Sequence, residues 1–95
     1  MGSAGAPPIR DAFGAIAHPI RRRIVEELAA GPRPAGKLGG GLPLSRPAVS
    51  QHLRLLLEVG MVSVERVGRE NHYRLHPERL DGVRGWLARL DASSG

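Results

Sequence analysis

The clearest hydrophobic pattern in the chain lies over residues 45–59 and predicts an α-helix. Ser45 is a suitable N-cap, because its hydroxyl can accept a hydrogen bond from a free backbone N–H of the first turn. Pro47 falls in that turn, where a missing N–H does no harm. The apolar residues recur at i, i+4, i+7 and i+8 on one face: Val49, Leu53, Leu56 and Leu57. The opposite face has no carboxylate and carries Arg46, Ser50, Gln51 and Arg54. Such a face suits a helix in the DNA major groove, although an ordinary amphipathic helix with a solvated face shows the same pattern.

Three shorter helices are predicted before it. Residues 9–17 form an apolar stripe of Ile9, Phe13, Ile16 and Ala17, but Gly14 costs about 1 kcal/mol relative to Ala. This helix is therefore expected only where it packs on something else. Pro19 begins a second helix that runs to about residue 30, with a buried stripe of Ile20, Ile24, Val25 and Leu28. Residues 35–40 predict a third, weaker helix anchored by Leu38 and followed by glycine.

Three consecutive arginines, 21–23, open the second helix. They could clamp a phosphate, or they could form a salt-bridged helix surface with Glu26 and Glu27 at helical spacing. The second interpretation is favoured.

Beyond Gly60, a natural helix C-cap, the period of the pattern changes. Residues 61–67 alternate between apolar and polar side chains, which predicts a half-buried strand. Residues 68–71 predict a turn. Residues 72–75 predict a return strand, with Tyr73 and Leu75 on the face opposite Arg74. Arg66 and Arg69 fall at the hairpin tip, where they can reach a phosphate or the minor groove.

A last helix is predicted over residues 78–91. Its apolar residues repeat at spacings of 3, 4 and 3, a narrow seam beside Trp86: Leu80, Val83, Leu87 and Leu90. Such a seam either covers its own domain or pairs with a second copy. Pairing is favoured, because the stripe of residues 9–17 also has no obvious partner.

Four helices, a hairpin and a last helix make a mainly α fold with a small β-hairpin (α+β), a winged helix-turn-helix. Residues 1–8 are expected to be a disordered lead-in, residues 9–91 one domain, and residues 92–95 a frayed tail.

Composition narrows the class of partner. The net charge is +5, and the fourteen cationic side chains are all arginine except Lys37. This positive charge indicates a polyanionic partner, such as nucleic acid or an anionic membrane surface. The absence of cysteine excludes disulfides and thiolate metal sites. No apolar run approaches the roughly 18 residues of a membrane span. The first eight residues lack the features of a signal peptide, so a cytoplasmic protein without a membrane partner is expected.

Three stretches together resemble the ArsR-type transcriptional regulators: His18–Ile24, Ser45–Val62 and Gly68–Leu75. The resemblance covers residues 9–90. It implies a dimeric bacterial repressor that binds double-stranded DNA at a palindromic operator, with the first and last helices forming the dimer interface.

The chain departs from the metal-sensing members of that family. Some members carry a Cys-x-Cys motif on the third helix, where this chain has residues 35–38, Ala-Gly-Lys-Leu. Others use Asp and His ligands on the last helix, where this chain has Asp81 but no histidine. No metal site and no cofactor are therefore predicted, and the effector is unknown. Zinc, nickel or arsenite is not expected to release the protein from DNA.

The predicted site residues form two sets. The DNA-contacting set is Ser45, Arg46, Ser50, Gln51, Arg54, Arg66 and Arg69. The dimer-interface set is Phe13, Ile16, Leu80, Val83, Trp86, Leu87 and Leu90.

The histidines have simpler interpretations. His52 faces partly inward and is expected to be a buried, hydrogen-bonded histidine rather than a base contact. His72 and His76 lie about 13 Å apart along an extended strand, too far to share a zinc ion. Ser50, His52 and Asp81 have the residue types of a hydrolase triad, but no strand-turn-helix elbow surrounds the serine. A protein-interaction module and a small enzyme are thus weaker hypotheses than a DNA-binding regulator, and a gel shift with DNA upstream of its own gene separates them.

Overall fold

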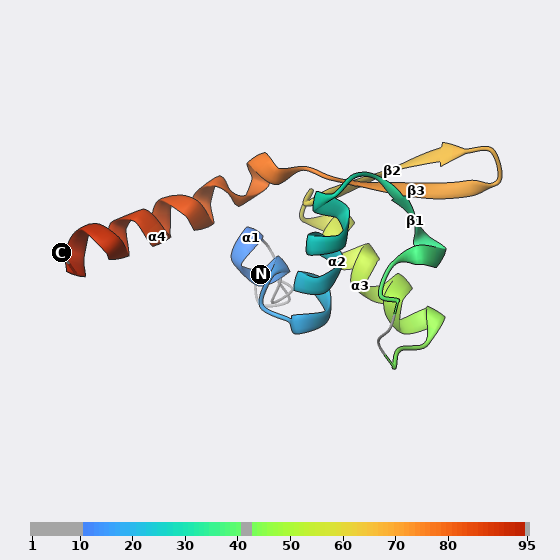
Figure 1. The fold of residues 1–95 in the computed structure, drawn as a ribbon, viewed down its shortest axis with the longest axis horizontal. Helices are drawn as coiled ribbons and strands as arrows, with labels where there is room; N and C mark the ends of the chain where they lie inside the picture. Colours follow the sequence, from blue (N-terminus) through green and yellow to red (C-terminus); the bar gives the residue numbers. More distant parts are fainter. Residues whose placement is uncertain (1–10, 41–42, 95) are drawn as a thin grey trace, which may run out of the picture.

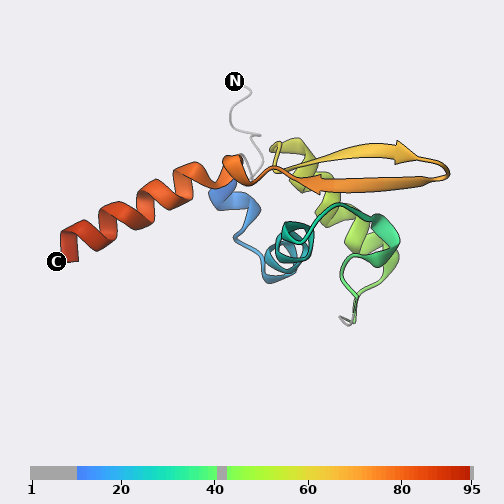
Figure 2. The same cartoon turned by 45° about the horizontal axis from the view of Figure 1, so that its top comes forward.

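Two helices form the centre of the molecule, with a hairpin extending to one side and the last helix to the other (Figures 1 and 2). The structure is a computed structural model and describes residues 11–40 and 43–94. Its elements, in chain order, are α1 (Ala12–Ala15), α2 (Pro19–Ala29), β1 (Arg33–Pro34), a 3-10 helix η2 (Ala35–Lys37), α3 (Arg46–Glu58), β2 (Val62–Val67), β3 (Glu70–Leu75), a second 3-10 helix η3 (Pro77–Leu80) and α4 (Asp81–Ser94).

The core lies where the apolar faces of α2 and α3 meet the base of the hairpin. The predicted stripes supply most of it: Ile24, Val25 and Leu28 from α2, and Val49, Leu53 and Leu56 from α3. The largest fully buried side chains of the described residues are Ile24, Leu53, Leu56 and Met61. Each contributes about 1.5–3 kcal/mol of transfer free energy, so this cluster fixes how α3 is presented to solvent.

The predicted ends of α3 are confirmed. The Ser45 hydroxyl accepts a hydrogen bond from the backbone N–H of Ala48 at 3.3 Å. At the other end Gly60 has φ +76°, the left-handed conformation that glycine adopts without strain. Its N–H donates to the carbonyl of Leu57 at 3.0 Å, and the N–H of Met61 donates to that of Leu56 at 3.0 Å.

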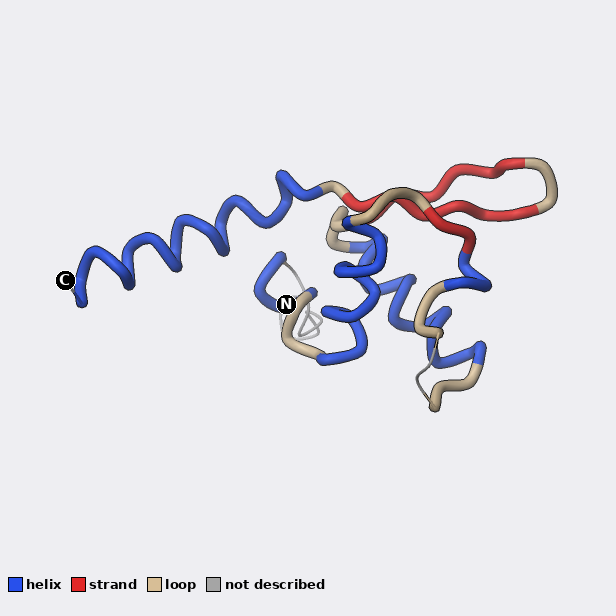
Figure 3. The backbone as a smooth tube through the Cα atoms, in the orientation of Figure 1, coloured by secondary structure: helices blue, strands red, loops and turns tan. Residues whose placement is uncertain are grey.

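The sheet has three antiparallel strands in the order β1-β3-β2 rather than the two of the predicted hairpin (Figure 3). β1, which the sequence pattern presents as a break, pairs through Arg33 with Tyr73. The predicted turn over residues 68–71 is also too long. β2 and β3 pair as far as Val67 and Glu70, so Gly68 and Arg69 alone form the turn, with Gly68 at φ +63°.

Three predicted helices have different bounds. The helix predicted over residues 9–17 is the four-residue α1, and Ile9 lies outside the described residues. The helix predicted over residues 35–40 is the 3-10 turn η2, because Gly39 adopts φ +74° and stops an α-helix there; Leu38 is buried as predicted. α4 continues to Ser94, past the predicted end at Asp91 and into the predicted frayed tail.

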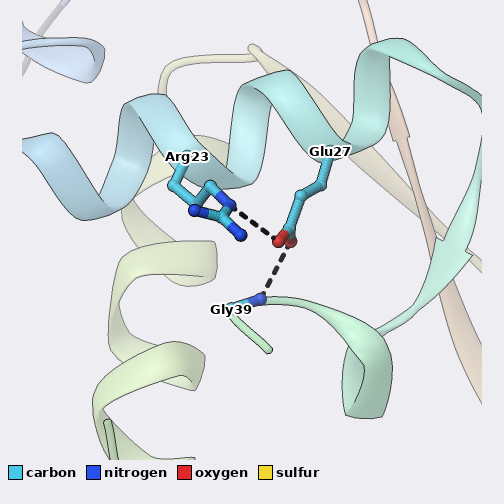
Figure 4. A network of polar contacts seen from close by, with 3 residues as sticks. All are labelled: Arg23, Glu27 and Gly39. Carbon is cyan, nitrogen blue, oxygen red and sulfur yellow. Dashed lines mark hydrogen bonds and ion pairs between the residues drawn. The ribbon is translucent and has the colours of Figure 1, made fainter. Parts of the chain in front are cut away.

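The three arginines of α2 have three different roles. Arg23 pairs with Glu27 at 3.1 Å, and the other oxygen of Glu27 accepts the backbone N–H of Gly39 at 2.9 Å (Figure 4). Arg22 donates to the carbonyl of Ile16 at 2.7 Å. Arg21 is buried and donates to carbonyls of α1. The salt-bridged surface is therefore correct for Arg23 only, and Arg21 is inaccessible to a phosphate.

Candidate nucleic-acid interface

The outer face of α3 brings three of the predicted DNA-contacting residues together. Ser50, Gln51 and Arg54 are exposed because the helical period that buries Val49 and Leu53 turns them outward. With Pro47 and Leu55 they line an open depression on the surface. The side chains that line the depression carry hydroxyl, amide and guanidinium groups and no carboxylate, which suits a negatively charged duplex. The exposed Glu58 follows Arg54 by one helical turn, so the predicted absence of a carboxylate is wrong for the last turn of this face.

The first residues of α3 are partly occupied by the fold itself. The hydroxyl of Ser45 already accepts the capping hydrogen bond, which leaves its own O–H as a donor. Arg46 is exposed, and its guanidinium packs over Gly36 of η2. A Cβ at residue 36 would lie 3.2 Å from the Arg46 Nη1 atom, so glycine gives this side chain its room.

The hairpin of β2 and β3 carries the other two predicted residues. Arg66 is exposed and donates through Nε to the carbonyl of Gly68 at 3.1 Å, while Arg69 is exposed in the turn. The predicted half-buried strand is wrong for most of β2, because only Val62 is buried and the rest of the strand extends away from the core. The hairpin tip and the start of α3 both lie on the side of the molecule away from α4 (Figures 1 and 2).

His52 lies on the inward side of α3. The predicted hydrogen bond is confirmed, but the residue is half-buried rather than buried. Its Nδ1 atom lies 3.2 Å from Nη1 of Arg21, and its ring lies 4.6 Å from the ring of His18. Burial, followed by the proximity of His18 and Arg21, lowers the pKa of His52.

The remaining titratable residues are dispersed. His72 contacts Glu70 at 3.1 Å, and His76 contacts the hydroxyl of Ser63 at 2.7 Å. Asp81 pairs with Arg84, so it does not join His52 in a triad. Across residues 11–40 and 43–94, no group of three histidine, aspartate or glutamate side chains is placed to hold a metal ion.

The predicted dimer-interface residues gather at α1 and the residue after it, and along η3 and α4. Phe13 and Trp86 meet edge to face at 5.7 Å, yet both remain more than 40% exposed, as do Leu87 and Leu90. Ile16, Leu80 and Val83 are half-buried and line a groove between the first two helices and the start of α4. The contact of Phe13 with Trp86 within one chain was not predicted from the sequence.

Arg21 is the functional candidate that the sequence pattern misassigned. Positions 21, 24, 25 and 28 have the spacing i, i+3, i+4 and i+7, so Arg21 lies on the buried stripe of α2. The helical spacing indicated a buried position, but arginine is a residue type usually found at the surface.

None of the described helices is long and apolar enough to cross a membrane.

The helix-turn-helix, the hairpin and the basic outer face together define a winged helix-turn-helix of the DNA-binding class. Residues 16–65 match a family model described as a helix-turn-helix domain. The transcriptional regulator Rv2034 of Mycobacterium tuberculosis is 45% identical over 79 residues, which cover 83% of this chain and 74% of Rv2034. The transcriptional repressor SmtB of the same species is 43% identical over 82 residues, but these span only 61% of its length and 79% of this chain.

Solved structures give the same result. An ArsR-like transcriptional regulator from Rhodococcus superposes with a TM-score of 0.71 at 31% identity, covering 98% of this chain and 86% of that one. A homodimeric winged helix-turn-helix DNA-binding domain from Mycobacterium bovis superposes with a TM-score of 0.64 at 25% identity, covering 85% and 78%. The chain belongs to the ArsR/SmtB family of transcriptional regulators, whose members are regulators and not enzymes.

Proposed function

We propose that this protein is a sequence-specific repressor that binds a palindromic operator as a homodimer. The observation that carries the proposal is the depression on the outer face of α3, where Ser50, Gln51 and Arg54 are exposed together and no lining residue is a carboxylate. Relatives named as transcriptional repressors support the direction of regulation.

In this proposal α3 reads bases in the major groove. Gln51 makes a bidentate contact to N6 and N7 of adenine, and Ser50 is short enough to contact a base or the backbone. Arg54, one turn further along the helix, contacts phosphate, as do Ser45 and Arg46 at the helix start. The positive end of the helix dipole at that start favours a phosphate.

The hairpin acts as a wing beside α3. Arg69 in the turn and Arg66 at the end of β2 contact the adjacent backbone or the minor groove. Arg66 is held by its bond to the Gly68 carbonyl, so its cation is presented with less loss of side-chain freedom than a free arginine.

The homodimer forms through α1 and α4. The side chains of Phe13, Trp86, Leu87 and Leu90 are all exposed on these two helices, and a mainly apolar groove lies between the first two helices and the start of α4. Exposed apolar side chains gathered in this way are typical of an interaction surface. The homodimeric solved relative supports a second copy as its occupant.

The test is binding to the DNA upstream of the protein's own gene, followed by footprinting. We expect specific binding at two half-sites whose centres lie about 10 base pairs, or a multiple of that, apart. A shuffled duplex of the same length is the control. Equal affinity for the two duplexes would contradict sequence-specific binding, and protection of a single half-site would contradict the two-fold arrangement.

A further inference from the structure

Arg21 connects α1 to α3 through one chain of hydrogen bonds. Its Nε donates to the carbonyl of Ala15 at 3.0 Å and its Nη2 to that of Gly14 at 3.3 Å. Its Nη1 meets Nδ1 of His52 at 3.2 Å. The arginine is only 7% exposed, and none of the ion pairs between described residues includes it. The last turn of α1 is therefore bonded to α3 through one buried cation.

This arrangement defines which nitrogen of His52 carries hydrogen. A guanidinium has only donors, so Nδ1 of His52 must accept, and the neutral ring carries its hydrogen on Nε2. His18 is bound in the same way, because its Nδ1 accepts the backbone N–H of Ile20 at 3.1 Å and thereby caps α2. A protonated imidazole has no acceptor, so protonation of His52 replaces its hydrogen bond to Arg21 with two opposed N–H groups.

The surrounding charges act in the same direction. The charged and titratable groups that face His52 are His18 and Arg21, both from the start of α2, while α1 contributes the carbonyls that bind Arg21. No carboxylate is among the groups that shift the pKa of His52, and burial is the largest cause of its lowering. The folded state therefore favours the neutral ring, and stability falls as pH drops through the ordinary histidine range towards that lowered pKa.

We propose that Arg21 and His52 form a proton-sensitive junction between the dimer face and the reading helix. Protonation of His52 separates α3 from Arg21, so α3 loses its fixed position and DNA binding weakens. This inference rests on the proposed function. The expected loss of DNA affinity at low pH is distinctive, because adding positive charge to a DNA-binding protein otherwise strengthens its binding to the polyanion.

The test compares wild type with the double variant His18→Asn/His52→Asn. Asparagine offers an amide oxygen near the position of Nδ1, is a favourable N-cap, and does not titrate. Between about pH 7.5 and about pH 5.5 we expect operator affinity to fall about tenfold in wild type, and to stay level or rise in the variant, since one proton changes affinity by at most tenfold per pH unit. The control His72→Asn/His76→Asn removes the other two histidines of the chain, and its operator affinity should still fall with pH as in wild type. Identical pH profiles for wild type and His18→Asn/His52→Asn would overturn the junction.

A second measurement does not depend on DNA. Nitrogen-15 chemical shifts should show hydrogen on Nε2 of His52 near pH 7.5, and the Tm of wild type should fall relative to His18→Asn/His52→Asn below about pH 6.5. Failure of wild type to bind any operator at neutral pH would refute the proposed function alone. Hydrogen on Nδ1 of His52, or parallel Tm profiles, would refute the junction alone.

Discussion

The wing and α4 both project from the core, in opposite directions, and both expose apolar side chains (Figure 1). Val67 near the wing tip and Leu90 on α4 are each 46% exposed. Their surroundings differ. Val67 lies between the guanidinium-bearing residues Arg66 and Arg69 of the hairpin, whereas Leu90 continues the apolar seam of Leu87, beside Trp86. Equal exposure thus accompanies different chemistry, and continuity of the apolar surface is what marks an interface.

The difference assigns one partner to each end of the molecule. The end with α3 and the wing presents cations and hydrogen-bond donors, which suit DNA. The end with α1 and α4 presents aromatic and aliphatic side chains, whose burial releases about 1.5–3 kcal/mol for each large residue. Substitutions at the two ends should therefore separate self-association from DNA contact.

The largest effect is expected from Leu87→Glu, which places a charge in the proposed dimer surface. We expect a monomer, with operator affinity lower by at least about 100-fold, because two linked half-sites bind far more tightly than one. Sedimentation measures the assembly. Trp86 is the only tryptophan in the chain, so its fluorescence should shift to longer wavelength on dissociation.

Ala92→Glu is the matched control for Leu87→Glu. Ala92 is exposed and lies five residues further along α4, about 140° around the helix from Leu87. This variant should remain a dimer. A wild-type protein that sediments as a monomer at micromolar concentration would refute the proposal that α1 and α4 form the dimer surface.

Within the DNA-binding end, substitutions should distinguish residues that contact bases from residues that neutralise phosphates. Gln51→Ala should cost about 1–3 kcal/mol on the operator and nothing on random DNA, because it removes a base contact. Arg69→Ala should weaken binding to both and lower the slope of log affinity against log salt by about one per half-site. Affinities measured for both duplexes across a salt series give these quantities.

Arg89→Ala, an exposed arginine on α4, is the control for Arg69→Ala and should leave the salt slope unchanged. Equal losses on both duplexes for Gln51→Ala, or an unchanged slope for Arg69→Ala, would show that the two roles are wrongly assigned.

Sequence signals predicted α3 well because they are local. The Ser45 cap, the helical apolar period and Gly60 all act within a few residues of the ends they define. The outward direction of Ser50 and Gln51 follows from the same period. Most core residues were also predicted, because the apolar stripes of α2 and α3 have no other surface to pack on.

The features that were missed depend on distant parts of the chain. β1 becomes a strand only through pairing with Tyr73 and His72, about forty positions later. The helical spacing places Arg21 on the buried stripe of α2, but the groups that satisfy its buried cation, the carbonyls of α1 and the ring of His52, come from other elements. The exposure of Val64 follows from the hairpin extending beyond the helices, which the alternating pattern of β2 does not encode.

The smallest effect is expected at Val67, where the comparison between the two ends is most direct. Neither Val67→Lys nor Val67→Glu should change the dimer, although Val67 is as exposed as Leu90. Lysine should strengthen binding to all DNA and glutamate should weaken it, each by less than about 1 kcal/mol, because an exposed charge at 0.1 M salt acts over only about 10 Å. The gain with lysine should be the smaller of the two, since Glu70 lies directly opposite in the register and pairs with the new cation. Sedimentation and a salt titration measure both properties. Dissociation of the dimer by either variant would mean that the wing also takes part in self-association, and the division of the molecule into two ends would fail.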